Sequence, residues 1–308
     1  MRICRDATQQ LLHFDSHRGI RPQSRWIAFN LLSELDQPGE WAVDRSTMTL
    51  YFIPPAPLTA DAAVFVSVGE NAVVADGASH VHLRNLRLLH ARGTGAVFRN
   101  ASGVMLSGCE VAMHGTAGLV IDGRSNSVRN CSIHSVGCGG LQLTGGSMRE
   151  LRRGDNEAVG NVIQGHSRWA RARSPGIYFA GVGNRYVSNR ILHTPDMAIY
   201  GGGNQAGVDG ACDNLFEGNT IDRAMFETTD TGAFCESSPR NHAFLTPLLL
   251  SDWVAWQTRA GSRIQGCRQG PVTNYRRAQA GSIAATSSLA TTSPTAGQST
   301  RSRRRQAP

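Results

Sequence analysis

Two successive segments of the chain read GAVFRNASGVMLSGCEVAMHG (residues 95–115) and GLVIDGRSNSVRNCSIHSVG (residues 118–137). Both consist of short runs of apolar or β-branched residues, and each run ends at Gly, Asn or Ser. Apolar and polar residues alternate within the runs, which is typical of short strands and differs from the 3.6-residue period of a helix. The two segments therefore predict a repeated unit built from short strands and turns.

The repeat continues over residues 61–235. A small residue opens each unit, at Gly95, Gly118, Gly140, Gly176, Ala198 and Gly232. These residues are 23, 22, 36, 22 and 34 positions apart. A second series, of apolar residues, keeps step with the first, at Val111, Ile133, Ile163, Ile191 and Ile221. The longer intervals therefore indicate loops that are inserted into a basic unit of about 22 residues.

A unit of this length has room for three short strands and three turns, but it cannot bury its apolar face alone. The units must therefore stack, which brings equivalent backbone positions of neighbouring coils to about 4.8 Å. The Leu-x-x-Leu-x-Leu spacing of leucine-rich repeats is missing. We therefore predict an all-β solenoid of parallel strands, a β-helix, over residues 61–235.

A different pattern precedes the repeat, in residues 1–60. Trp41 and Val43, then Leu50 and Phe52, alternate around a polar turn. This alternation predicts a β-hairpin that leads into the solenoid.

The net charge of +8 lies in the last part of the chain. Residues 240–308 hold ten arginines and one acidic residue, so the other 239 residues carry a net charge of −1. Residues 236–308 are also of low complexity, which predicts a disordered basic tail. A nucleic-acid partner would depend on this tail alone, and a solvated run of terminal charges explains it better. We therefore expect no nucleic-acid partner.

The cysteines and the apolar runs exclude several other classes of protein. The seven cysteines include no C-x-x-C pair, so neither a zinc site nor a dense disulfide network is expected. No apolar run approaches the roughly 20 residues of a membrane span, and the N-terminal residues lack a signal-peptide core. We expect a monomer without membrane association, and the residues themselves leave the compartment open.

Three segments resemble a known superfamily. PGIYFAGVGNRYVSNRILHTPDMAIYGGGN (residues 175–204), followed by ETTDTGA (residues 227–233), resembles the right-handed parallel β-helix proteins of the pectate-lyase-like superfamily. LLSELDQPGEWAVDRSTMTLYFIPP (residues 31–55) is similar to the segment before the coils of β-helix proteins related to glycoside hydrolases. The resemblance covers roughly residues 25–235. It implies a right-handed β-helix, a polysaccharide or oligosaccharide substrate and an extracellular location.

The chain departs from this pattern at three places. Asp196 stands where the superfamily usually has His, and Met48 stands in the hairpin turn where it has Gly. The relatives also continue for several coils past the ETTDTGA-like motif, where further acidic residues lie. Here the chain continues as CESSPRNHAFLTPLLLS (residues 235–251), so we expect the coils to stop and part of the cleft to be missing.

Counting from the small residues predicts two columns of side chains on successive coils. Asp230 lies two residues before Gly232, and Asp196 lies two residues before Ala198; the same count gives Ser174 on the coil before. Five residues before the small residue, the count gives Glu227, His193 and Arg171. Acidic side chains would then be stacked on neighbouring coils.

Two carboxylates about 4.8 Å apart cannot both ionise easily, so the pKa of one should rise. Such a pair supplies an acid and a base from identical side chains. Retaining glycosidases hold their carboxyl groups about 5–5.5 Å apart and inverting ones about 6.5–9.5 Å. We therefore predict Asp230 and Glu227, and after them Asp196, as catalytic carboxylates of a glycoside hydrolase. His193, Arg171 and Trp169 are predicted to bind the substrate.

Other roles remain open for these residues. An Asp before a Gly turn often bonds its own backbone, His193 could serve a coil turn, Arg171 could be a solvated rim charge, and Trp169 could cap the solenoid. We expect no cofactor for a hydrolase. Ca²⁺ bound by the acids would instead suit a polysaccharide lyase acting on a uronate polymer, and a non-catalytic scaffold that binds glycan or protein is the third alternative.

Four asparagines lie just before members of the apolar series, at Asn130, Asn161, Asn189 and Asn219. They predict an asparagine ladder that satisfies the backbone groups of the turns.

Overall fold

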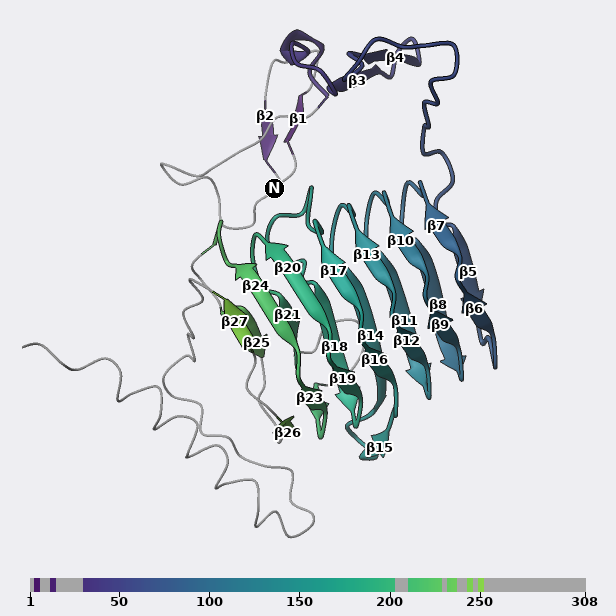
Figure 1. Ribbon diagram of the computed structural model, residues 1–308, viewed down its shortest axis with the longest axis vertical. Helices are drawn as coiled ribbons and strands as arrows, with labels where there is room; N and C mark the ends of the chain where they lie inside the picture. Colours follow the sequence, from purple (N-terminus) through teal and green to yellow (C-terminus); the bar gives the residue numbers. More distant parts are fainter. Residues whose placement is uncertain are drawn as a thin grey trace, which may run out of the picture.

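The computed structural model describes residues 3–5, 12–14, 30–202, 210–228, 232–236, 243–245 and 249–251. Three parallel sheets of seven stacked strands run side by side along the molecule (Figure 1), and each coil of the chain passes through them in the same order. This is the predicted parallel β-helix.

The first sheet contains β5 (Val73–Asp76), β8 (Ala96–Ser102), β11 (Leu119–Arg124), β14 (Leu141–Ser147), β18 (Ile177–Val182), β21 (Ile199–Gly201) and β25 (Phe234–Glu236). The second contains β6 (His82–Arg84), β9 (Met105–Ser107), β12 (Ser127–Arg129), β16 (Glu157–Val159), β19 (Arg185–Val187), β23 (Leu215–Glu217) and β26 (Ala243–Leu245). The third contains β7 (Arg87–Leu89), β10 (Glu110–Ala112), β13 (Ser132–His134), β17 (Val162–Gln164), β20 (Arg190–Thr194), β24 (Thr220–Ala224) and β27 (Leu249–Ser251). Two short strands, β15 (Arg152–Arg153) and β22 (Ala211–Cys212), pair with β14 and β18 of the first sheet.

The register of the sheets confirms both series except at one position. All five apolar residues of the second series pair with one another across the third sheet. The first five small residues also lie in register. The sixth is wrong by one residue, because Ile199 pairs with Phe234 and Ala198 therefore lies opposite Ala233, not Gly232. Gly232 and Ala233 are both small, so residue size could not decide between them.

The core lies between the three sheets and consists of the alternate residues that point inward, such as Ile121, Ile133 and Ile163, which are fully buried. At the later coils it is aromatic. Tyr186 and Phe216 stack with their ring centroids 5.0 Å apart, and the Tyr186 hydroxyl donates a 2.8 Å hydrogen bond to the Leu143 carbonyl. The repeat thus buries the apolar face that a single coil would expose.

The turns between sheets share a two-residue pattern. Between the second and third sheets the first turn residue has a left-handed backbone, at Asn85, Gly108, Asn130, Gly160, Ser188 and Gly218. The next residue is turned inward at the later coils, where Asn161, Asn189 and Asn219 are at most 2% exposed. Gly and Asn suit the left-handed position, because they tolerate a positive φ better than other residues.

The inward residues form the predicted ladder, with one correction. The side-chain oxygen of Asn189 accepts hydrogen bonds from the backbone and side-chain nitrogens of Asn161. The side-chain oxygen of Asn219 accepts the same two bonds from Asn189. Asn130 does not belong to this ladder, since it occupies the left-handed position one residue earlier. Cys131 takes the ladder position in its coil, and its backbone N–H donates to Asn161.

A second ladder, which the sequence analysis missed, lies between the first and second sheets. It consists of Asn126, Asn156, Asn184 and Asn214, all fully buried. Each of the last three accepts a hydrogen bond from the backbone N–H of the asparagine one coil earlier. Asparagine side chains therefore link successive coils along two edges of the solenoid.

The hairpin predicted before the coils is present. Strands β3 (Trp41–Asp44) and β4 (Thr49–Phe52) pair antiparallel, with Trp41 opposite Phe52 and Val43 opposite Leu50. Met48, in the turn, has a φ of 54°, the conformation that a glycine would adopt more easily. A short 3-10 helix, η1 (Leu32–Glu34), precedes the hairpin, and β1 (Ile3–Arg5) pairs with β2 (Leu12–Phe14).

The coils continue past the point where the sequence suggested that they stop. Strand β26 pairs in parallel with β23, and β27 pairs with β24. The segment CESSPRNHAFLTPLLLS therefore contributes to all three sheets. The remainder of the predicted disordered tail lies outside the described residues, and in the described part of the chain no helix is long and apolar enough to cross a membrane.

Candidate functional site

An ion pair joins two of the predicted site residues at the edge where the third sheet turns into the first. Arg171 lies in the loop between β17 and β18, and Glu227 lies in the loop between β24 and β25. Arg171 donates from Nε and Nη2 to the two carboxylate oxygens of Glu227, the first bond being 2.8 Å long. Hydrogen bonding to Glu227 raises the pKa of the Arg171 guanidinium. The pairing favours the ionised forms of both groups.

The Arg171–Glu227 pair is accessible from outside. The two side chains are 35% and 29% exposed. Arg171 also donates to the Ser167 carbonyl at 3.3 Å, and the ring centroid of Phe226 lies 6.0 Å from its guanidinium carbon. Glu227 therefore presents a fixed carboxylate at the surface of this edge.

Asp196 lies on the coil between these two loops, and its side chain is engaged on both sides. One carboxylate oxygen accepts a 2.7 Å hydrogen bond from the backbone N–H of Arg173, and the other accepts from the Thr228 hydroxyl. Asp196 is only 4% exposed. It joins three successive coils, and its oxygens face protein donors.

His193 does not lie in a column with Arg171 and Glu227. It is the exposed residue of β20 with a left-handed backbone, at a φ of 51°. The register of β20 with β24 places it opposite Arg223, which has the same conformation. The count from Gly232 and Ala198 gave a wrong column here, because the loop before β25 is longer than the loop before β21.

Trp169 lies in the same loop as Arg171 and packs against the preceding coil. Its backbone N–H donates to the Gly137 carbonyl at 2.8 Å. A side chain at position 137 would meet the indole, because a Cβ there would lie 2.2 Å from its Cδ1. The Arg168 guanidinium carbon is 5.8 Å from the ring centroid, and the residue is 42% exposed. Trp169 thus covers the coil turn and still shows part of its ring.

Asp230 lies outside the described residues. Its role as a catalytic carboxylate stays a prediction.

A buried histidine lies beneath this edge. His166 Nδ1 is 2.7 Å from the Ser167 hydroxyl, which in turn donates to the Ser174 carbonyl. His166 Nε2 has no hydrogen-bond partner in the described part of the chain. Burial lowers the pKa of His166 to about 4, so the ring is neutral at physiological pH.

Two tyrosines that the sequence analysis missed lie on the outer face of the first sheet beside this edge. Tyr178 and Tyr200 are paired across β18 and β21 and are partly exposed, whereas Ile177 and Phe179 point into the core. The two rings are 5.9 Å apart, centroid to centroid, and tilted by 58°. Burial raises the pKa of Tyr178 to about 12. The alternation of the GIYFAG and AIYGGG segments carried this signal, since it places both tyrosines outward.

No group of three or more His, Cys, Asp or Glu side chains is arranged to hold a metal ion within the described ranges.

Comparison with known proteins supports the fold. Residues 58–173 match the family model described as a right-handed β-helix region. The chain is a right-handed parallel β-helix. No curated protein and no solved structure matches it. The comparisons therefore identify an architecture, and a function must be inferred from the residues at its surface.

Proposed function

We propose that this β-helix binds a polysaccharide or oligosaccharide and hydrolyses a glycosidic bond at the edge that carries Glu227. The observation that supports the proposal is the position of Tyr178 and Tyr200, which form a partly exposed aromatic pair on the first sheet. Tyr200 is only four residues beyond Asp196. A sugar that lies over these rings would extend toward the exposed carboxylate of Glu227.

Aromatic side chains of this kind suit a sugar ligand. A tyrosine ring offers an apolar face to the C–H groups of a pyranose and a hydroxyl to its polar rim. Tyrosine also contributes contact area at a small cost in side-chain entropy. Trp169, with 42% of its surface exposed at the same edge, would add a third ring.

The ion pair with Arg171 supports one of the two acidic roles of a glycosidase for Glu227, and the other role falls to the second predicted carboxylate. Glu227, paired with Arg171, is the ionised carboxylate and would act as the nucleophile or the general base. Asp230, three residues further on, would act as the general acid. Asp196 has a positioning role in this proposal, because its two oxygens already hold the backbone of Arg173 and the side chain of Thr228.

The full chain tests the proposal directly. Glu227→Gln and Asp230→Asn should each lower kcat on a cleaved polysaccharide about 10²–10⁴-fold, the usual contribution of a general acid or base. Glu110→Gln is the matched control. Glu110 is also ion-paired to an arginine, Arg87, and its side chain is 30% exposed, but it lies on the third sheet at β10.

Three results separate the alternatives. Equal hydrolysis by the wild type and both variants would refute the assignment of the two carboxylates. Release of unsaturated products that absorb in the ultraviolet, lost when Ca²⁺ is chelated, would identify a lyase. Binding of a glycan without any cleavage would identify a non-catalytic scaffold.

A further inference from the structure

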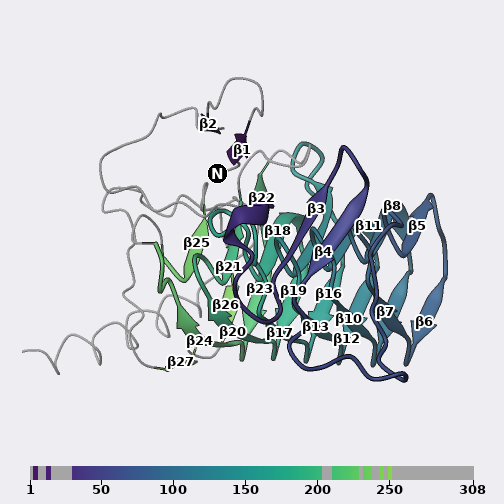
Figure 2. The same ribbon diagram turned by 90° about the horizontal axis from the view of Figure 1, so that it is seen from above.

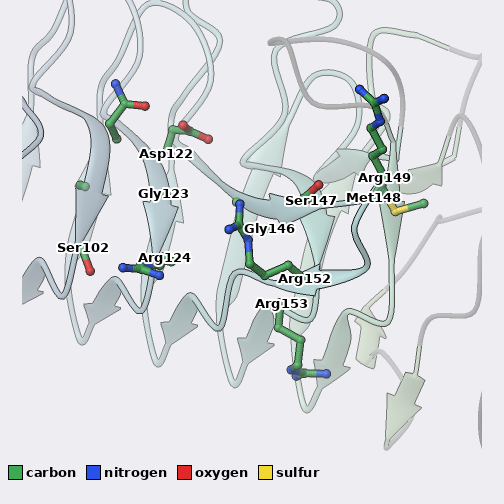
Figure 3. A pocket seen from close by; sticks show the side chains of 13 residues that line it. Ser102, Asp122, Gly123, Arg124, Gly146, Ser147, Met148, Arg149, Arg152 and Arg153 are labelled. Carbon is green, nitrogen blue, oxygen red and sulfur yellow. The ribbon is translucent and has the colours of Figure 1, made fainter.

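A second candidate site, formed by described residues, lies at the opposite edge of the first sheet. It is a cavity of about 640 Å³ at the ends of β8, β11 and β14, where the chain turns toward the second sheet. Four arginines line it, Arg124, Arg149, Arg152 and Arg153. Figure 3 shows Arg152 near the centre, with Arg124 to its left, Arg153 below it and Arg149 above and to the right.

A local excursion of the chain brings three of these arginines together. Strand β14 ends at Ser147 and the chain returns as β15, which pairs antiparallel with it so that Arg152 lies opposite Ser147 and Arg153 opposite Gly146. The neighbouring coils have no such excursion. Those coils contribute Ser102, at the end of β8, and Arg124, at the end of β11, to the lining of the cavity.

Gly123, Gly145 and Gly146 are among the residues that line the cavity. Gly123 and Gly145 have φ angles of 142° and 155°, and a Cβ on Gly145 would lie 1.8 Å from the Gly123 carbonyl oxygen. These residues must be glycine for the coils to stack at this turn. Because they carry no side chains, the space above them stays open.

The arginines differ in how far they are already neutralised. Arg153 is fixed, since it pairs with Asp155 and Asp213 and donates to the Gly183 carbonyl at 3.0 Å. Arg152 has a single ion pair with Glu150 at 3.2 Å, in which both side chains are at least 60% exposed. An exposed pair of this kind contributes about 0–1 kcal/mol and is easily exchanged for another anion.

The other two arginines do not take part in the ion pairs named above. Within the described residues no acidic side chain forms an ion pair with Arg124 or Arg149. Among the described residues that line the cavity, Asp122 is the only one with a carboxylate, and it accepts a 2.8 Å hydrogen bond from the Thr144 hydroxyl. Positive charge therefore exceeds negative charge in the lining, although the chain outside its basic end is nearly neutral.

We propose that this cavity binds an anionic sugar residue, one that bears a sulfate or carboxylate group, with Arg124 and Arg152 as its main ligands. A guanidinium donates two parallel hydrogen bonds to either group. The volume lies in the range of small-ligand sites. The sugar ligand rests on the proposed function, whereas the preference for an anion follows from the arginines alone.

Calorimetric titration of the full chain tests the proposal without requiring catalysis. The probes are three oligosaccharide pools of matched length, one sulfated, one carboxylated and one neutral. We expect one acidic pool to bind at least tenfold more tightly than the neutral pool, and the better one identifies the group. The Arg124→Ala/Arg152→Ala variant should lose at least tenfold in affinity for it. Raised salt should weaken the binding, because exposed charges are screened.

Arg185→Ala/Arg190→Ala is the control, because it removes the same charge from exposed positions on the second and third sheets. Arg124→Lys/Arg152→Lys, which keeps the charge, should retain part of the affinity and guards against a variant that merely misfolds. Equal affinity for all three pools, or an equal loss in the control variant, would overturn the proposal. Cleavage of a neutral glycan without any acidic preference would overturn it and leave the proposed function intact. Preferential binding of an acidic pool without cleavage of any glycan would support this proposal and refute the proposed function.

Discussion

Replacement of Asn189 by alanine should destabilise the coils more than the loss of any exposed asparagine. The Asn189 side chain makes four hydrogen bonds of 2.9–3.1 Å, to the backbone and side-chain nitrogens of Asn161, to the Ala158 carbonyl and to Asn219. Asn189 and Asn161 are fully buried. The substitution leaves the backbone N–H of Asn161 without this acceptor in a place that water does not reach.

A buried donor left unpaired costs about 1–3 kcal/mol, and each further hydrogen bond lost costs about 1 kcal/mol. Because Asn161 Nδ2 and Asn219 Oδ1 keep other partners, the total should be near 3 kcal/mol. Urea unfolding followed by circular dichroism should show a midpoint lower by about 1 M, if the slope is near 3 kcal/mol/M.

Asn130→Gly is the matched control. Asn130 is exposed and its φ is 51°, a conformation that glycine adopts without strain. The change should leave the free energy of unfolding within about 0.5 kcal/mol of the wild type, as for most surface positions. If both variants lost the same stability, Asn130 would belong to the ladder as the sequence suggested, and the register of the turns given above would be wrong.

Three further outcomes follow from the same coordinates. Asp196→Asn should lower stability by about 2 kcal/mol, because an amide nitrogen would face the Arg173 N–H or the Thr228 hydroxyl in place of an acceptor; thermal unfolding measures this, and an unchanged midpoint would contradict it. His166 has a pKa near 4 when folded and near 6.5 when unfolded, so the unfolded state binds the extra proton and stability should fall between pH 6.5 and about 4; His166→Gln should flatten that part of the profile, and a profile identical to the wild type would refute the link. Tyr178→Ala and Tyr200→Ala should each weaken glycan binding about 2- to 13-fold with little change in kcat, since a ring contact contributes about 0.5–1.5 kcal/mol; affinity electrophoresis that shows wild-type retention would argue against the aromatic subsite.

The fold could be predicted from the sequence because the coils repeat along a single axis. Each coil contacts only its neighbours, so a period read from small and apolar residues is also a register in space. The series from Val111 to Ile221 was right at every member, because these positions must be apolar and must face inward. The series of small residues failed at its last member, where a loop changes length and two small residues are adjacent.

The candidate site was harder to predict, because its residues lie in the loops. Counting back from the small residues grouped Arg171, His193 and Glu227, and only Arg171 and Glu227, 56 residues apart, form an ion pair. His193 lies elsewhere, because the loops before the strands of the first sheet differ in length from coil to coil. The second ladder was missed although its spacing resembles that of the first. The residue that follows the asparagine is polar or charged in three of the four cases, so no series of apolar residues marks Asn126, Asn156, Asn184 and Asn214.

The longest interval in the repeat, from Gly140 to Gly176, explains why two surfaces of different chemistry occur on one solenoid. Its extra residues are divided between two places. Two residues separate β11 from β12, but nine separate β14 from β16; six separate β13 from β14, but twelve separate β17 from β18. The first insertion carries three of the four arginines of the cavity, and the second carries Trp169 and Arg171. Figure 2 shows strands of the first sheet, among them β8, β11, β18 and β21, in a row along the stacked coils. The two insertions lie at opposite ends of the strands of one sheet, so an extended ligand that crosses its outer face could contact both. A glycan that contacts Tyr178 and Tyr200 and also reaches Arg124 would have to cross that face, so the Tyr178→Ala and Arg124→Ala effects on its affinity should not be additive if one chain occupies both places.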